Sequence, residues 1–204
     1  MAYNNDSDSR SAPVGIKLLI AGGFGVGKTT FVGAVSEITP VTTEETLTVA
    51  SIGTDDLRDI KDKTTTTVAM DFGRLTLDDS YVLYLFGMPG QERFWSMWNE
   101  MSDGALAAVV LTDTRRLGDC FSAIDFFEHR RIPFIVALNS FDDAPVYEIA
   151  EVRAALDLPS HVPVVHCDAR ESRSSAQVLV SLVRYLLTSA THMSRSTTSL
   201  GAGQ

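Results

Sequence analysis

Short apolar runs alternate with polar segments along most of the chain. Three of them are continuously apolar, at residues 105–113, 133–139 and 162–167, and the run at 15–21 also reads as a buried strand. Such runs are typical of parallel strands that are covered on both faces of a sheet. Between residues 68 and 87, two β-rich runs flank a polar turn at 78–80, which predicts an antiparallel hairpin. The pattern therefore predicts five parallel strands and one antiparallel hairpin strand.

Helical patterns fill the gaps between these runs, at residues 29–35, 115–130, 146–157 and 174–190. The last has an apolar stripe made by Val178, Leu179, Leu182, Val183 and Leu186. Alternating strands and helices predict an α/β fold, here a doubly wound, mostly parallel six-stranded sheet with helices on both faces. Ligands bind such sheets at the carboxyl ends of the strands.

The length of 204 residues suits one domain with a substantial core. We place this domain at residues 14–191. The polar stretches at 1–13 and 192–204 contain few apolar residues, so we expect them to be disordered tails.

The run GGFGVGKT at residues 22–29 fits the phosphate-loop pattern G-x-x-x-x-G-K-[ST], and it lies between a predicted strand and a predicted helix. Glycines let backbone N–H groups surround a phosphate, and the helix N-terminus adds partial positive charge. Lys28 would reach the β- and γ-phosphates, and the Thr29 hydroxyl would bind Mg²⁺. The residues assigned here to nucleotide binding are Gly22, Gly25, Val26, Gly27, Lys28, Thr29 and Thr30. The alternative is a glycine-rich turn without a ligand.

The composition is that of an ordinary globular protein, with a formal charge of −9 from 26 acidic and 17 basic residues. This balance argues against a nucleic-acid partner, which needs clustered Lys and Arg. Cys120 and Cys167 are 47 positions apart without metal-ligand spacing, and no run approaches the length of a membrane span. We therefore expect a cytoplasmic protein with no direct membrane insertion. The residues leave open whether a partner recruits it to a membrane.

Three further motifs follow predicted strands in a fixed order. TTTTVAMDF ends at residue 72, MPGQERF covers 88–94, and NSFD covers 139–142. Together with the phosphate loop, they resemble the Ras-like small GTPases over about residues 15–190. Within that superfamily, the polar tails and the TTTTVAMDFG and PGQERF runs are similar to the bacterial gliding-motility type and to the G proteins of actinobacterial conservon operons. The resemblance implies a phosphate-loop G domain.

The resemblance also implies two nucleotide-sensing switches, at about 60–70 and 87–101. In switch I, Thr67 would close over Mg²⁺ and the γ-phosphate. The alternative is that the threonine run is only the β-branched start of a strand. In switch II, the Gly90 N–H would bind the γ-phosphate and Gln91 would orient the attacking water. The resemblance thereby assigns catalytic roles to Gln91, Lys28 and Thr67. It assigns metal binding to Thr29 and Thr67.

Base recognition is assigned through the same resemblance to Asn139, Asp142, Asp168, Ala169 and Arg170. The Asp142 carboxylate would accept from guanine N1–H and N2–H₂, whereas adenine presents an acceptor there. The Ala169 N–H would bond guanine O6, and Arg170 would lie over the base. A polar strand-end turn is the alternative, and Asp143 is the alternative register.

The chain departs from the family pattern at three positions. Gly87 replaces the aspartate that holds Mg²⁺ through water, and neither Asp71 nor Asp113 is an obvious substitute. Ser140 replaces the lysine of the guanine motif, and Phe24 is a bulky side chain inside the phosphate loop. We therefore expect weak Mg²⁺ binding and slow hydrolysis.

The leading hypothesis is a GTP/GDP switch that uses Mg²⁺ and has weak intrinsic GTPase activity, stimulated by a partner. The resemblance implies a roadblock-type regulatory protein and a downstream effector at the switches. On the helix expected after residue 93, Phe94, Met97, Trp98 and Met101 share a face that we assign to the core, whereas Trp95 lies off it as a candidate partner contact. The alternatives are a nucleotide-binding adaptor without turnover and an ATPase.

Overall fold

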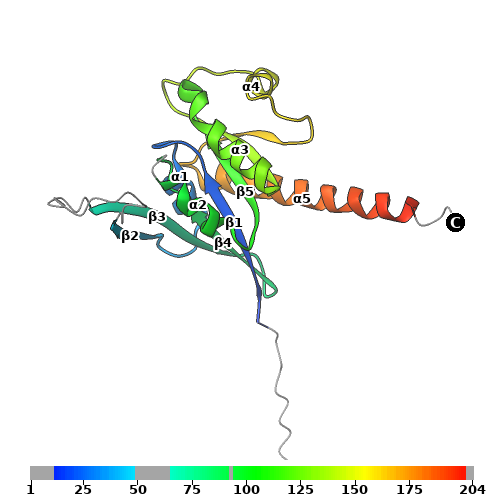
Figure 1. Cartoon of the computed structure of the whole chain (residues 1–204), viewed down its shortest axis with the longest axis horizontal. Helices are drawn as coiled ribbons and strands as arrows, with labels where there is room; N and C mark the ends of the chain where they lie inside the picture. The colour runs from blue at the N-terminus through cyan, green and yellow to red at the C-terminus, as the bar shows by residue number, and fades with distance from the viewer. Residues whose placement is uncertain (1–11, 49–64, 92–93, 201–204) are drawn as a thin grey trace, which may run out of the picture.

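The computed structural model describes residues 12–48, 65–91 and 94–200, with the side chains of 42–69 and 192–200 left outside this description (Figure 1). One seven-stranded sheet organises these residues, in the order β2-β3-β4-β1-β5-β6-β7. Its strands are β1 (Val14–Ala21), β2 (Val41–Thr48), β3 (Thr65–Thr76), β4 (Tyr81–Gly87), β5 (Ala105–Thr112), β6 (Phe134–Asn139) and β7 (Val164–Cys167). Only β3 runs against its neighbours in this sheet.

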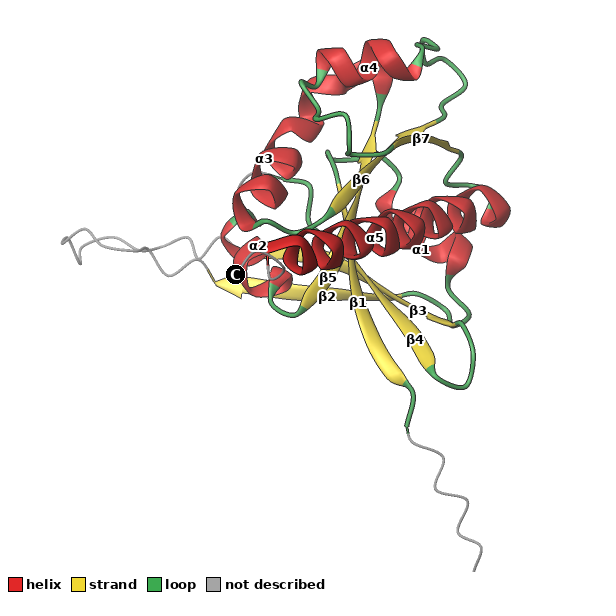
Figure 2. Cartoon of the chain, turned by 90° about the vertical axis from the view of Figure 1, so that its right-hand side faces the viewer, coloured by secondary structure: helices red, strands yellow, loops and turns green. Residues whose placement is uncertain are grey.

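Helices cover both faces of the sheet (Figure 2). On one face lie α1 (Lys28–Val35) and α5 (Ser172–Leu200), which bury Phe31, Val178 and Leu182 against β1, β4 and β5. On the other face lie α2 (Ser96–Ser102), α3 (Phe121–Arg130) and α4 (Ile149–Ala155), which bury Trp98 and Phe127. Two apolar cores therefore sandwich strands whose central residues have almost no contact with solvent, as their continuously apolar sequences require.

The predicted fold class is confirmed: a doubly wound, mostly parallel sheet with one reversed hairpin strand and helices on both faces. The predicted count of six strands is one short, because β2 pairs with β3 at the edge of the sheet. The segment expected as one helix from 115 is a 3-10 helix, η2 (Thr114–Cys120), followed by α3. The last helix continues to Leu200 instead of ending near 190, so part of the stretch assigned to a C-terminal tail is helical.

Five parallel strands bring their carboxyl ends to one edge of the sheet. The phosphate loop follows β1, residues 88–91 follow β4, and Asp113 follows β5. The guanine-type motif begins in the last residue of β6, and Asp168 follows β7. Segments that lie far apart in the chain, such as the phosphate loop and Asp168, therefore meet at this edge.

Candidate functional site

The phosphate loop has a backbone that only glycine tolerates at two of its fixed positions. Gly22 has φ +132° and Gly27 has φ +102°, both in the region that L-residues rarely adopt. A Cβ at Gly22 would collide with the carbonyl oxygen of Leu111 on β5, and a Cβ at Gly27 would lie 2.7 Å from Nδ2 of Asn139. The glycines thus allow both the left-handed turn and the close approach of two neighbouring strand ends.

Side-chain donors hold four carbonyl groups of the loop. Lys28 Nζ donates to two of them at 2.9 and 2.7 Å, Arg116 Nη2 to a third at 3.0 Å, and Asn139 Nδ2 to the fourth at 2.9 Å. The acceptors belong to Gly22, Gly23, Phe24 and Val26. With these carbonyls held by donors, backbone N–H groups of the loop are the donors that could face an anion, as in other backbone nests.

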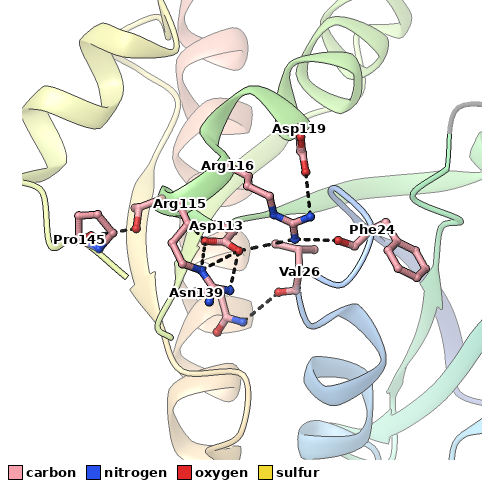
Figure 3. A network of polar contacts seen from close by, with 9 residues as sticks. Phe24, Val26, Asp113, Arg115, Arg116, Asp119, Asn139 and Pro145 are labelled. Atoms are coloured by element: carbon pink, nitrogen blue, oxygen red, sulfur yellow. Dashed lines mark hydrogen bonds and ion pairs between the residues drawn. The ribbon is translucent and has the colours of Figure 1, made fainter. Parts of the chain in front are cut away.

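Arg116 reaches the loop from η2, where a buried carboxylate anchors its neighbour (Figure 3). Asp113 accepts from the backbone N–H of Arg115 and pairs with its guanidinium at 2.8 Å, and these hydrogen bonds lower the pKa of Asp113. The backbone departs from helical geometry at Arg116, with φ −142° and ψ 55°. Arg115 covers the ring of Phe141 at 4.0 Å, whereas Arg116 lies against Phe24 (Figure 3). The sequence analysis missed Arg116, for which no motif gives a signal.

Lys28 sits in a partly buried position at the start of α1. Burial lowers the pKa of Lys28 to about 8, and the negative charge of Asp71 acts in the opposite direction. Its ammonium group donates to two carbonyls of the loop. A phosphate would replace neutral acceptors by charged oxygens, which bind an ammonium group more strongly.

Asp71 lies opposite Gly87, although the sequence made it no obvious substitute for the aspartate missing there. Asp71 in β3 stands directly opposite Gly87 in β4, and its Oδ2 accepts from the Thr29 hydroxyl at 2.6 Å. A Cβ at Gly87 would lie 2.9 Å from Cβ and 3.0 Å from Oδ2 of Asp71. The Asp71 side chain therefore fills the space that a side chain at 87 would need.

Thr29 and Asp71 offer oxygen ligands of the kind that Mg²⁺ prefers. The Thr29 hydroxyl and a carboxylate oxygen of Asp71 lie at hydrogen-bond distance from each other. Among the described residues, no group of three or more His, Cys, Asp or Glu could hold a metal by itself. This pair fits a Mg²⁺ ion that takes its remaining ligands from water and phosphates, which is the usual arrangement for this ion.

The predicted switch II residues lie against the phosphate loop. A Cβ at Gly90 would lie 2.7 Å from Lys28 Nζ and 2.8 Å from the Gly22 carbonyl oxygen, so only glycine can approach this closely. The Pro89 carbonyl accepts from the indole N–H of buried Trp98 at 3.0 Å. Gln91 lines a cavity of about 370 Å³ together with Thr29, Thr30, Lys28, Asp71, Gly90 and Phe24. Phe24 is 64% exposed in the wall of this cavity and is not packed into the core.

Thr67 occupies a different place from the one that its predicted role requires. Its backbone lies in β3 opposite Thr46 of β2, and its side chain is outside the described part of the chain. Four extended residues separate it from Asp71, which corresponds to about 13 Å along the strand. The structure therefore does not bring Thr67 to Thr29. Residues 60–64 of switch I, and Glu92 and Arg93 of switch II, lie outside the described residues.

Asn139 connects the phosphate loop to the predicted base-recognition loop. It is 6% exposed, donates from Nδ2 to Val26, and accepts from the Ala169 N–H at Oδ1 with a distance of 2.9 Å. The Ala169 N–H assigned to guanine O6 is therefore already bonded to Asn139. One amide side chain thus holds the ends of β1, β6 and β7 in a fixed relation.

Asp142 and Asp168 share a single guanidinium group. Arg170 Nη1 donates to Asp142 at 3.1 Å, and its Nε and Nη2 form a fork on Asp168 at 2.9 and 2.8 Å. The hydrogen bonds from Arg170 lower the pKa of Asp168. Arg170 is therefore brought to the guanine-type motif as predicted, but it contacts the carboxylate of Asp142 in this structure.

The aromatic segment after switch II largely follows the predicted face. Phe94 and Trp98 are buried, and Met97 and Met101 are half-buried. Trp95 is 37% exposed and packs its ring against that of Trp98, with 5.7 Å between centroids. A second cavity, of about 280 Å³, lies between these rings, Gln91 and η2.

Along the described residues, none of the helices combines the length and apolar content needed to cross a membrane.

Comparison with known proteins supports this arrangement. Residues 20–189 match the family described as "Conserved hypothetical ATP binding protein". The G domain of the FeoB iron transporter from T. maritima superimposes with a TM-score of 0.58 at 18% identity, over 84% of this chain and 99% of that one. The Arl6 (BBS3) small GTPase from Trypanosoma brucei gives 0.61 at 19% identity, over 86% and 99%. The FeoB G domain from Methanococcus jannaschii gives 0.54 at 12% identity, over 84% and 97%. These structures establish a G-domain fold. No curated protein matches the chain.

Proposed function

The chain belongs to the family of conserved hypothetical ATP binding proteins. Within this nucleotide-binding family, we propose that it is a guanine-nucleotide switch that binds GTP and GDP with Mg²⁺. The observation that carries this proposal is the position of Asn139. Its two hydrogen bonds join the phosphate loop to the loop after β7, and Asp142 follows it at the N-x-x-D spacing of a guanine site. Base and phosphates would therefore be held by one rigid edge.

Nucleotide binding would begin at the phosphate loop. Lys28 would transfer its hydrogen bonds from the Gly22 and Gly23 carbonyls to phosphate oxygens, and the N–H of Gly90 would bond the γ-phosphate. Gln91, in the same cavity, would orient a water molecule for in-line attack. Positive charge from Lys28 and the N–H groups of Gly25 and its neighbours would stabilise the transferring phosphoryl group.

Thr29 would hold Mg²⁺ through its hydroxyl, with Asp71 in place of the aspartate that the chain lacks at 87. The ion, when bound, supplies charge neutralisation between the β- and γ-phosphates. The carboxylate of Asp71 fixes the orientation of the Thr29 hydroxyl through their 2.6 Å hydrogen bond. Thr67 would complete switch I only if β3 and β2 rearrange, because Thr67 is paired with β2 here.

One wall of the phosphate cavity would limit stimulation by a catalytic arginine from a partner. Phe24 is exposed beside Gln91 and would restrict the approach of an arginine from a partner. We therefore propose weak turnover that a roadblock-type regulator raises by repositioning switch II, with Trp95 as a contact of the effector. Such a switch would act in the cytoplasm, where a partner could bring it to a membrane.

Two observations favour a second candidate, an adenine-nucleotide protein. The description of the family names ATP, and Asp142 is paired with Arg170 instead of being free for guanine. An adaptor that binds nucleotide without turnover shares the same site and differs only in hydrolysis.

Nucleotide selectivity distinguishes these candidates. The protein is stripped of nucleotide and titrated calorimetrically with GDP, a non-hydrolysable GTP analogue, ADP and an ATP analogue, each with Mg²⁺ and with EDTA. We expect GDP and the GTP analogue to bind more tightly than the adenine nucleotides, and an Asp142→Ala variant to lose this preference. Tighter adenine binding selects the second candidate, and guanine-selective binding without GTP hydrolysis above that of a Gln91→Ala variant selects the adaptor.

A further inference from the structure

The base-recognition carboxylate has a partner within its own chain. Asp142 is 84% exposed, yet its Oδ1 accepts from Arg170 Nη1 at 3.1 Å. Arg170 does not reach it by chance, because a second carboxylate fixes the guanidinium: Asp168 accepts from Nε, Nη2 and the backbone N–H of Arg170. Asp168 is itself held, since its N–H donates to the Ser174 hydroxyl at 2.8 Å.

The chemistry of this contact resembles that of the expected ligand. A guanidinium group presents planar N–H donors to a carboxylate, and the N1–H and N2–H₂ edge of guanine presents the same pattern. Arg170 Nη1 occupies Oδ1 of Asp142, one of the two oxygens that the N1–H and N2–H₂ pair of guanine would use. Adenine has no such pair of donors at this edge and would not compete with Arg170 for Asp142.

We propose that Arg170 is a specificity-determining residue that occupies Asp142 in place of the base, so that guanine must displace the Arg170–Asp142 contact to bind. This inference rests on the proposed guanine site and deepens it. When guanine displaces Arg170 from Asp142, the hydrogen bonds from Nε and Nη2 of Arg170 to Asp168 remain. Only the contact with Asp142 therefore has to break. The result is a guanine preference smaller than the carboxylate alone would give, while adenine binding is unaffected.

The contact is exposed, so its effect is modest and sensitive to salt. Exposed ion pairs change an equilibrium by no more than about fivefold. We expect removal of the guanidinium to tighten GDP binding by about threefold at low ionic strength, and the gain to shrink at about 0.5 M salt because the screening length falls to a few ångströms. ADP affinity should stay constant.

The test compares nucleotide-stripped wild type with Arg170→Ala and with Arg173→Ala by calorimetric titration with GDP and ADP. Arg173 is exposed near the start of α5, so its removal controls for the loss of one positive charge near an anionic ligand. The same Arg170→Ala substitution in an Asp142→Ala background completes a double-mutant cycle, because without Asp142 there is nothing for Arg170 to occupy.

Tighter GDP binding in Arg170→Ala, absent from Arg173→Ala and from the Asp142→Ala background, supports the inference. Weaker GDP binding in Arg170→Ala overturns it and shows that the arginine packs on the base instead. Selective GDP binding by wild type with no change in Arg170→Ala overturns this inference alone. Failure of every variant to prefer guanine overturns the proposed function together with it.

Discussion

Single residues carry the clearest evidence of how this chain replaces family features. The side chains of Asp71 and of an aspartate at 87 would compete for one space between β3 and β4. We predict that Asp71→Asn lowers the Mg²⁺-dependent gain in GDP affinity by about tenfold, because a partner that orients a metal ligand typically contributes that much. Calorimetric titration with Mg²⁺ and with EDTA measures this gain.

A matched variant returns the carboxylate to β4. Gly87→Asp alone should destabilise the fold, since its Cβ would lie 2.9 Å from Cβ of Asp71 and would bring a second carboxylate beside the first. Combined with Asp71→Gly it should recover most of the Mg²⁺ dependence. If the double variant binds no better than Asp71→Asn, the carboxylate between these strands does not serve the metal.

The pKa of Lys28 predicts the pH dependence of binding. In the free protein it is about 8, and phosphate charges raise it in the complex, so binding takes up a proton above pH 8. GDP affinity should fall by about twofold between pH 7 and 8 and then by up to about tenfold per pH unit. Titrations at several pH values measure the slope. Lys28→Arg keeps its charge throughout this range, so an equal slope in that variant would assign the effect to another group.

Sequence reasoning located the residues that act through fixed spacing and missed those that act across strands. The phosphate loop and Asn139 follow local patterns, and their predicted positions meet at one edge. Asp71 could not be recognised, because its role depends on the β3–β4 register that places it opposite Gly87. Arg116 is equally invisible in the sequence, since a single non-helical residue in η2 directs it onto Phe24.

At the scale of elements, η2 braces the phosphate loop. Arg116→Ala removes the donor to the Phe24 carbonyl, and we predict that GDP dissociates about threefold to tenfold faster, as expected from the loss of one charge-assisted hydrogen bond. Displacement of labelled GDP by excess unlabelled GDP gives the rate. Arg153→Ala is the matched control, because Arg153 also donates to a carbonyl, that of Pro159, at a distance from the loop. A similar acceleration in both variants would contradict a specific brace.

The strand that sequence patterns missed, β2, has few apolar residues. In β2 the sequence VTTEETLT has only two apolar residues, and as an edge strand it needs only β3 as a partner. Its four threonines and its valine are β-favouring and were the signal available. The central strands were predictable because burial on both faces demands continuous apolar runs, as in β6.

For the whole molecule, the site joins the ends of five strands, so ligand binding should stabilise the fold as one unit. At a GDP concentration of about 100 times Kd, linkage gives about 2.7 kcal/mol. For a domain of this size that corresponds to an increase in Tm of about 5–10 °C. Scanning calorimetry measures the shift. Guanosine is the control, since it lacks the phosphates, and an equal shift with guanosine would show that the phosphate loop contributes little.

The position of the tryptophans gives this protein a built-in optical reporter. The chain has two tryptophans, and both lie beside switch II, with Trp98 bonded to Pro89 and Trp95 partly exposed next to it. Tryptophan fluorescence therefore comes from one small region of the chain. Movement of Pro89 would remove the hydrogen bond of one indole and change the solvent around the other. Nucleotide exchange could thus be followed in the unlabelled, unmodified chain as a change in emission.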